Sequence, residues 1–211
     1  MDFTRAITYV FREEKWWKKL LITGLISVIP VVGLIYLIGW ISEVVLRVKW
    51  GDYSVLPEKP SWSFLKEGIK LFLTSLIYII PYLIVSLFIR FISWGWSLIF
   101  SGVIEKFGVG FFGFLNDAVA LVYFFIFFYI IPAVLYLYLD HKNVRDTLNF
   151  KRVYQMIKND SKTFLSLLIS IILAIIIASI GVSLFYIGVI FTIPFAAAFY
   201  AHLLGQVSRG Y

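Results

Sequence analysis

The chain contains four long runs of apolar residues, and these runs constrain its fold more than any other feature. They extend from Leu20 to Val48, Leu71 to Ile104, Ala118 to Leu139 and Phe164 to Leu204. A helix needs about 20 apolar residues to cross the hydrocarbon core of a bilayer. Hydrophobic residues make up 61% of the sequence and charged residues only 15%, whereas soluble domains are about 45–50% apolar and about 25% charged. The sequence therefore predicts an integral membrane protein.

The run lengths predict four full spans and one shorter element. The last run is long enough for two spans, with a break between Gly181 and Gly188. The first run allows a hairpin whose arms would be only about 20 Å long, too short for two full crossings. Such a hairpin would turn at residues 30–33. We therefore predict an all-α integral membrane protein, a helical bundle of four full spans plus a short proline-kinked N-terminal hairpin, giving six helices.

These elements are expected to form a single transmembrane domain over residues 1–211. Its segments are an amphipathic interfacial segment at 1–19, the short hairpin at 20–48, an interfacial helix and span at 62–104, a span at 118–139, an interfacial helix and span at 149–183, and a span at 185–204. Because the sequence alone does not decide whether 20–48 turns back, a single crossing stays the alternative to the hairpin.

Similar proline-containing segments recur along the chain. Residues 19–30 align without gaps with residues 70–81, and the sequence Tyr-Ile-Ile-Pro at 78–81 recurs at 129–132. One interpretation is a duplicated, kinked building block of the kind found in transporters. The other is chance similarity between isoleucine-rich segments, since membrane helices tolerate proline. The expected kink positions are Pro30, Pro81, Pro132 and Pro194.

Basic amphipathic segments precede three of the apolar runs. In the segment at 150–158, aromatic and aliphatic residues recur at helical spacing and basic residues occupy the opposite face. Such helices are typical of the headgroup layer, where they bind anionic lipid. Alternatively, these segments are solvated helix ends that pack on the bundle. The residues expected to contact lipid headgroups are Lys15, Lys18, Lys19, Lys66, Lys70, Lys151, Arg152 and Lys158.

The distribution of basic residues predicts the orientation. If residues 20–48 form a hairpin, all of the 19 Lys and Arg residues except Arg90 and Lys106 lie on one side of the membrane. A single crossing would divide them between both sides. Cytoplasmic loops carry the excess of Lys and Arg, so we expect a multi-pass protein of the cell membrane with both termini in the cytoplasm.

Three ionisable residues fall within or beside the apolar runs, where a polar role is the first hypothesis. Glu43 precedes Arg47 by four residues, the order that favours a helical ion pair. Arg90 is expected to reach the opposite headgroups by snorkelling. Asp117, with Asn116, is expected to cap the helix that follows. An intramembrane polar role is a hypothesis for Glu43, Arg90 and Asp117.

Motifs for catalysis or cofactor binding are weak. The sequence has no cysteine, which excludes thiolate metal sites and cysteine nucleophiles. The two histidines, His141 and His202, have no partner at ligand spacing. Residues 108–113 match a dinucleotide fingerprint but lack its strand and helix context, so they are expected to form a flexible aromatic loop. We expect no enzyme activity, no catalytic residue, no metal and no cofactor.

Two groups of short motifs carry a family resemblance. The N-terminal group is Gly39-Trp40, Arg47, Leu56-Pro57-Glu58, Phe64, Gly68 and Pro81, and the C-terminal group is Asn149 to Tyr154, Pro194-Phe195 and Tyr200-Ala201-His202. With these motifs the chain resembles the domain of unknown function 4013 family. The resemblance covers nearly the whole chain and implies a polytopic membrane protein of a family frequent in archaea. It implies no catalytic residue.

The expected function is a membrane-embedded scaffold or accessory subunit that binds anionic lipid and has no catalytic activity of its own. Its expected partners are membrane lipid and either a membrane protein or a second copy of the chain, and not nucleic acid. The alternative is a small permease or channel, which a hydrophobic or lipid substrate would suit because the spans offer few polar groups.

Cysteine labelling tests the predicted orientation. Because the chain has no cysteine, Thr4→Cys and Ser54→Cys each introduce the sole thiol. We expect neither variant to react with a membrane-impermeant maleimide in intact cells, and both to react after permeabilisation. Labelling of either residue from outside would contradict a cytoplasmic N-terminal region.

Overall fold

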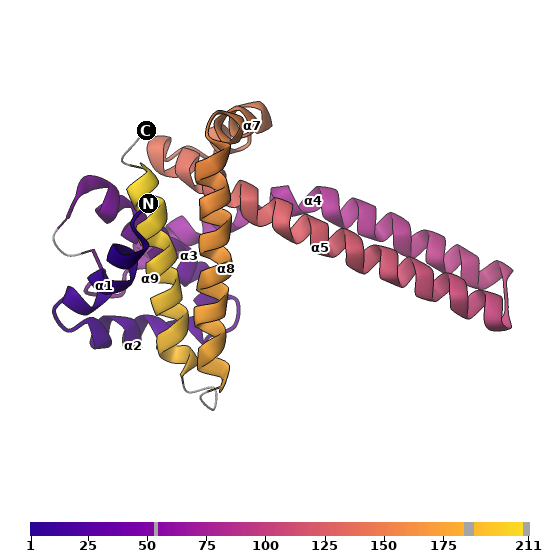
Figure 1. Ribbon diagram of the computed structural model, residues 1–211, viewed down its shortest axis with the longest axis horizontal. Coiled ribbons are helices and arrows are strands. Elements are labelled where there is room, and N and C mark those ends of the chain that lie inside the picture. The colour runs from indigo at the N-terminus through magenta and orange to yellow at the C-terminus, as the bar shows by residue number, and fades with distance from the viewer. Residues whose placement is uncertain (53–54, 184–187, 209–211) are drawn as a thin grey trace. The chain divides into compact units, whose positions relative to one another are not determined.

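The computed structural model describes residues 1–52, 55–183 and 188–208, and its regular structure there is entirely helical (Figure 1). Ser54, one of the two labelling positions, and the first residues of the span predicted at 185–204 lie outside the described residues. The helices are α1 (Phe3–Arg12), α2 (Trp16–Ser27), α3 (Val32–Trp50), α4 (Trp62–Ile99), α5 (Gly102–His141), α6 (Val144–Thr147), α7 (Phe150–Asn159), α8 (Ser161–Ser183) and α9 (Val189–Ser208).

Four of these helices are long and apolar enough to cross a membrane, namely α4, α5, α8 and α9. The predicted all-helical membrane fold with four candidate spans is therefore confirmed. In the last run, α8 ends at Ser183 and α9 begins at Val189, and residues 184–187, where most of the predicted break falls, lie outside the described residues. Pro81, Pro132 and Pro194 lie inside helices that continue past them, and Pro30 lies in the turn between α2 and α3.

The described chain divides into two compact units. The first comprises residues 1–74 and 129–211, and the second comprises residues 75–128. The long helices α4 and α5 belong partly to each unit.

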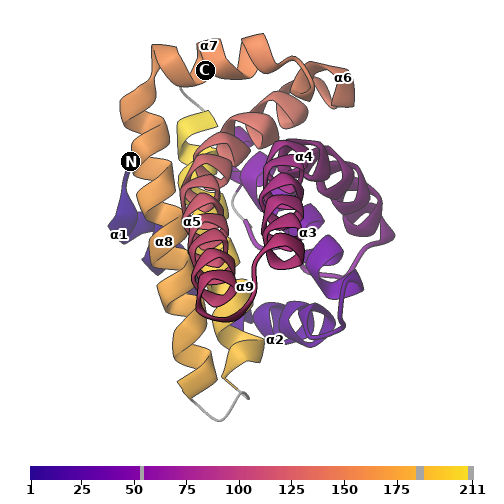
Figure 2. The same ribbon diagram turned by 90° about the vertical axis from the view of Figure 1, so that its right-hand side faces the viewer.

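In the first unit, α9 is the central helix. It packs against α8, α3, α2 and α1, and Figures 1 and 2 both show α8 and α9 side by side. Small residues on α9 permit its close contacts with neighbouring helices. Ala197, Ala201 and Gly205 follow each other at four-residue spacing, and all are buried. A Cβ atom on Gly205 would lie 2.5 Å from the Val48 Cβ in α3. Close packing of small residues is a usual basis for helix association in membranes.

The first apolar run forms two helices, α2 and α3, which pack against each other and against α9. The turn between them places Val31 at φ 62°, a conformation that is costly for a β-branched residue. Neither helix is among the four candidate spans. At 12 residues, α2 is about 18 Å long and matches the expected arm length, whereas α3, at 19 residues, is about 28 Å long and exceeds it.

Helix α3 crosses the start of α4 with almost no space between their backbones. A Cβ atom on Gly39 would lie 1.8 Å from the Phe64 carbonyl oxygen, and one on Gly68 would lie 1.9 Å from the Ile35 carbonyl oxygen. Each helix therefore supplies a glycine where the other helix's backbone passes. This crossing explains why glycine occupies these two positions of the N-terminal motif group.

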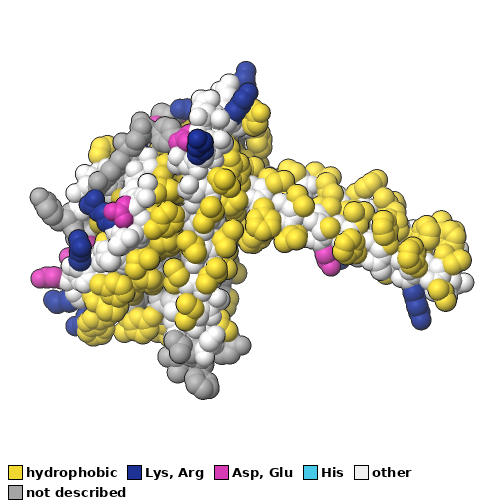
Figure 3. Space-filling model, in the orientation of Figure 1, with side chains coloured by type: hydrophobic (Ala, Val, Ile, Leu, Met, Phe, Trp, Pro, Cys, Tyr) yellow, Lys and Arg dark blue, Asp and Glu magenta, His cyan; other side chains and the backbone are white. Residues whose placement is uncertain are grey.

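The second unit consists of the paired parts of α4 and α5. Inside it, Ser86 Oγ donates to Asn116 Oδ1 at 2.7 Å, and Trp96 Nε1 donates to the Ile104 carbonyl at 3.1 Å. Outside, large apolar side chains dominate the part of its surface seen in Figure 3. Residues such as Leu87 (70% exposed) and Phe107 (74% exposed) are suited to contact lipid rather than water.

Two local predictions for this region are wrong. Helix α5 begins at Gly102, not Ala118, so residues 108–113 are helical and do not form a flexible loop. Asn116 and Asp117 lie inside α5 and cap no helix. Glycine costs a helix only about 1 kcal/mol, whereas an unpaired backbone group in hydrocarbon costs several. The Gly108 position also packs against the Trp96 ring.

The predicted interfacial segment 1–19 contains more than one helix. It forms α1 and the start of α2, and Lys15 adopts a left-handed conformation between them. In α1, Ala6, Tyr9 and Val10 are buried, whereas Ile7 and Phe11 are 42% and 52% exposed.

The helix crossing predicts a clear difference between two glycines. Gly39→Ala should lower the free energy of unfolding by about 1–3 kcal/mol or more, because the added methyl group overlaps backbone atoms that cannot move independently. Gly110→Ala is the matched control, since its Cβ would meet nothing within 4 Å and alanine is the better helix former. Unfolding of the detergent-solubilised variants measures both effects, and equal stability of the two would contradict the crossing.

Candidate functional site

A buried ion pair joins the end of α1 to the start of α2, across the turn between the two helices. Glu13 caps the end of α1 and Lys19 lies in the first turns of α2. The left-handed Lys15 reverses the chain between them, which brings the Lys19 Nζ within 2.8 Å of the Glu13 Oε2. The two side chains are only 8% and 6% exposed. Charges removed from water in this way need further hydrogen bonds.

The loop after α3 supplies those hydrogen bonds. Glu13 Oε1 accepts hydrogen bonds from the backbone N–H groups of Val55 and Leu56, and Lys19 donates to the Leu56 carbonyl at 3.2 Å. The Leu56 side chain is completely buried. The motif Leu56-Pro57-Glu58 is therefore fixed to the α1–α2 turn by an ion pair that the sequence analysis did not identify.

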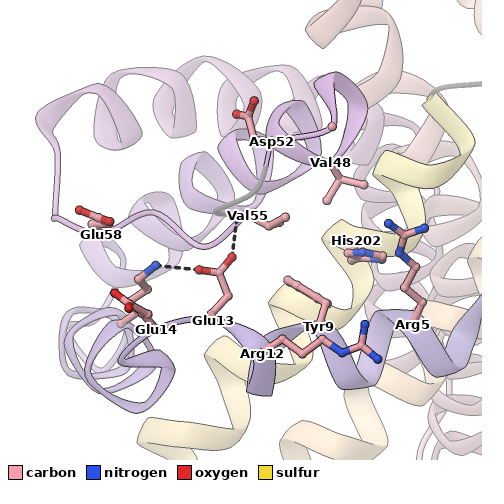
Figure 4. Close-up of a pocket in the computed structure, with 12 residues that line it drawn as sticks. Arg5, Tyr9, Arg12, Glu13, Glu14, Val48, Asp52, Val55, Glu58 and His202 are labelled. Atoms are coloured by element: carbon pink, nitrogen blue, oxygen red, sulfur yellow. Dashed lines mark hydrogen bonds and ion pairs between the residues drawn. The ribbon is translucent and has the colours of Figure 1, made fainter.

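Beside this ion pair lies a cavity of about 520 Å³ in the first unit (Figure 4). Such a volume is within the usual range for small-molecule sites. Residues from α1, the α1–α2 turn, the α3 end, the following loop and α9 line it: Arg5, Tyr9, Arg12, Glu13, Glu14, Lys19, Val48, Gly51, Asp52, Val55, Glu58 and His202.

Tyr9 and His202 form one wall of this cavity. Their rings stack with centroids 4.2 Å apart, and the Tyr9 hydroxyl donates to the Ala198 carbonyl at 3.0 Å. Burial raises the pKa of the Tyr9 phenol well above its ordinary value, and the Glu13 charge adds to the rise. Tyr9 therefore stays neutral and keeps donating to the α9 backbone.

Gln206 fixes both the N-terminus and the His202 ring. Its Oε1 accepts from the Asp2 N–H at 2.7 Å and its Nε2 donates to the Asp2 carbonyl at 3.0 Å. The same Nε2 lies 3.0 Å from His202 Nδ1. Since an amide nitrogen only donates, Nδ1 accepts, and the neutral ring carries its proton on Nε2.

The remaining charged groups of the cavity separate by sign. Arg5 and Arg12 lie on α1, whereas Asp52 and Glu58 come from the loop after α3 and Glu14 from the α1–α2 turn. In Figure 4 the two guanidinium groups lie toward His202, and the carboxylates of Glu14, Asp52 and Glu58 lie away from it. Within the described chain, these five charged groups take part in no ion pair.

A second cavity of about 440 Å³ shares Glu58 with the first. It is lined by Glu43, Arg47, Pro57, Glu58, Lys59, Ser61, Ser63 and Phe64. Arg47 Nε donates to Glu43 Oε1 at 2.9 Å, so the structure contains the helical ion pair that the sequence predicted. The loop with the Leu-Pro-Glu motif thus contributes residues to both charged cavities.

The residues predicted to bind lipid headgroups differ in their surroundings. Lys19 is buried in the ion pair described above, and Arg152 forms an ion pair with Asp146 at 3.3 Å. Lys70 pairs with Glu67 at 3.2 Å. The exposed members of this set are Lys15, Lys18, Lys66, Lys70, Lys151, Arg152 and Lys158.

Arg90 and Asp117, proposed for a polar role, are exposed residues of the second unit. Arg90 ends a row of polar residues on α4 that the sequence analysis missed, namely Tyr78, Tyr82, Ser86 and Arg90 at four-residue spacing. The Tyr123 hydroxyl donates to the Tyr78 carbonyl, and its ring stacks on Tyr82. The regular spacing was the signal that could have revealed this row.

The donor groups do not suit a metal centre. Within the residues that the structure describes, no group of three or more His, Cys, Asp or Glu side chains is placed to hold a metal ion. The cavity chemistry instead consists of separate guanidinium and carboxylate groups, which bind ions of opposite charge through charge-assisted hydrogen bonds.

Comparison with known proteins gives one match. The family model DUF4013, described as "Protein of unknown function (DUF4013)", matches residues 22–186. Neither the curated proteins nor the solved structures contain a match to this chain. The matched range includes the Leu-Pro-Glu loop but ends before His202.

Breaking the buried ion pair should be strongly destabilising. Lys19→Met leaves the Glu13 carboxylate buried without its charged partner, which should cost about 3–5 kcal/mol of unfolding free energy. Lys18→Met is the matched control because Lys18 is exposed. The double variant Glu13→Gln, Lys19→Met should recover much of the loss. Denaturant unfolding in detergent measures all three, and a Lys19→Met variant as stable as the control would contradict the role of the pair.

Proposed function

The chain belongs to the DUF4013 family of proteins of unknown function, and we propose that it is a membrane-embedded scaffold or accessory subunit that binds anionic lipid at its cytoplasmic face. The proposal depends chiefly on one observation, the exposed aromatic and basic side chains of α7. The charge distribution of the chain and the bonding of its polar groups support it.

On α7, Phe150, Tyr154 and Lys158 follow one another at four-residue spacing and therefore share one side of the helix. Phe150 is 57% exposed and Tyr154 is 64% exposed, although burial of an aromatic side chain is favourable. Val153, on the neighbouring side, is buried. An exposed aromatic stripe ending in a lysine suits the boundary between headgroups and acyl chains.

An exposed aromatic side chain next to a lysine also occurs at two other places in the first unit. Lys18 Nζ lies 5.2 Å from the ring centroid of Trp17, which is 47% exposed. At the start of α4, Trp62 is 79% exposed and precedes the exposed Lys66 by one helical turn. Tryptophan and lysine side chains are common anchors at the membrane interface.

The order of the spans supports a cytoplasmic location for these residues. With four spans, the start of α4, the end of α5, the start of α8 and the end of α9 fall on one side of the membrane. All Lys and Arg residues except Arg90 and Lys106 then belong to that side. The positive excess typical of cytoplasmic segments supports the proposal that this side faces the cytoplasm.

Polar groups within α8 and α9 favour a scaffold over a transport pathway. Ser170 Oγ donates to the Ser166 carbonyl at 2.7 Å, Ser208 Oγ to the Leu204 carbonyl at 2.9 Å, and Thr192 Oγ1 to the Ala178 carbonyl at 3.0 Å. A pathway needs polar groups that converge on the solute, whereas these groups bond to helix backbones.

One observation favours the alternative, a small permease or channel. In the second unit, the row Tyr78, Tyr82, Ser86 and Arg90 gives α4 a polar side. Ser86 is buried and bonded to Asn116, so part of the row serves helix pairing. Flux measured in proteoliposomes with Arg90→Gln would identify a transport role by a loss of transport.

Removal of two exposed lysines tests the lipid interaction. Lys151→Gln combined with Lys158→Gln should weaken the stabilisation of the purified protein by phosphatidylglycerol, because each lysine near an anionic surface contributes about 1 kcal/mol, or about fivefold in affinity. The measurement is the shift of Tm when phosphatidylglycerol replaces phosphatidylcholine in the detergent micelle. The shift should also diminish in high salt.

Lys106→Gln is the control for this experiment, since Lys106 belongs to the opposite side in the proposed orientation. It should keep most of the lipid-dependent Tm shift. If the control loses as much of the shift as the double variant, or if neither loses any, the proposed lipid-binding face is wrong. The scaffold role is tested separately by purifying the protein from native membranes in mild detergent, where a scaffold should retain a partner protein.

A further inference from the structure

We propose that the 520 Å³ cavity of the first unit binds a small zwitterion that carries a phosphate and a primary amine, with phosphoethanolamine as the representative compound. The same chemistry occurs free in solution and as a lipid headgroup. The proposal goes beyond lipid binding by α7, because the cavity has its own residues and a free molecule would need no membrane.

The phosphate side of the cavity is formed by Arg5 and Arg12. They lie seven residues apart on α1, which is two helical turns, so both side chains leave the same side of the helix. Neither guanidinium group has a hydrogen bond or ion pair within the described chain. Guanidinium groups bind phosphate oxygens in a bidentate manner. His202 lines the same cavity.

The amine side is formed by Asp52, Glu58 and Glu14. Their carboxylates are likewise without an ion-pair partner in the described part of the chain. Glu13 contributes no free charge, since Lys19 neutralises it at 2.8 Å. A simple anion would meet repulsion from the three carboxylates, and a simple cation would meet repulsion from the two arginines. A ligand with both charges satisfies both sides.

Part of the cavity wall is fixed before a ligand binds. Tyr9 is held by the α9 backbone, His202 by Gln206, and the loop carrying Glu58 by the buried ion pair. Preorganisation of this kind lowers the entropy cost of binding. The cavity also joins residues of both motif groups, because Glu58 comes from the N-terminal group and His202 from the C-terminal group.

Calorimetry on the purified full-length protein in phospholipid-free detergent tests the first arm of the proposal. Phosphoethanolamine should bind at least about tenfold more tightly than inorganic phosphate or ethanolamine alone, because each lacks one set of charged hydrogen bonds. Arg5→Gln with Arg12→Gln, and separately Asp52→Asn with Glu58→Gln, should each weaken binding by about tenfold or more. These side chains bond to no described residue, and a Tm equal to that of the wild type verifies the fold.

Nanodiscs provide the second arm and distinguish the two sources of the ligand. Phosphatidylethanolamine should raise the Tm more than phosphatidylcholine does, since the methylated amine of the latter cannot donate hydrogen bonds to carboxylates. Loss of this preference in the arginine and carboxylate variants identifies a lipid headgroup as ligand. Binding of free phosphoethanolamine without such a preference identifies a soluble ligand.

The variant Lys151→Gln with Lys158→Gln is the matched control in both arms. It should leave phosphoethanolamine binding unchanged even though it reduces stabilisation by phosphatidylglycerol, so failure of the pocket and failure of the α7 lipid face are distinguishable. The proposal is overturned if inorganic phosphate binds as tightly as phosphoethanolamine. It is equally overturned if no free or lipid probe responds to substitution of Arg5 and Arg12.

Discussion

The buried ion pair between Glu13 and Lys19 determines the arrangement of the N-terminal third of the protein. One carboxylate and one ammonium group, 2.8 Å apart, hold the α1–α2 turn and the Leu-Pro-Glu loop together. Because neither charge is stable alone in a buried position, the turn, the loop and both helices must be correctly placed at the same time. The two charged cavities, which share Glu58 of this loop, depend on this interaction.

The rest of the first unit is organised by close approach of helix backbones. Helix α9 carries alanine and glycine where it contacts α3. Where α3 crosses α4, Gly39 of α3 lies against the α4 backbone and Gly68 of α4 lies against the α3 backbone. In a membrane, where apolar side chains gain little from leaving lipid, such close contacts and interhelical hydrogen bonds supply the association energy. The central position of α9 also explains why its sequence is rich in alanine while the lipid-facing spans are rich in larger residues.

The spans, their approximate limits and the Glu43–Arg47 pair could be predicted because each depends on local composition or helical spacing. The start of α5 could not be predicted. The glycine-rich residues 108–113 resemble a loop unless the contact with the Trp96 ring and the membrane environment are known. The cavity could not be predicted either. Arg5, Asp52 and His202 lie far apart in the sequence, and only the turn at Lys15 and the packing of α1 on α9 bring them together.

The lengths of α4 and α5 have a consequence of their own. At 38 residues, α4 extends over about 57 Å, while the hydrocarbon core of a typical bilayer is about 30 Å thick. Its run of apolar residues from Leu71 onward also exceeds that thickness. Such a hydrophobic mismatch is relieved by tilting of the helices or by local thickening of the bilayer. The fit of the paired helices of the second unit in a bilayer therefore depends on membrane thickness.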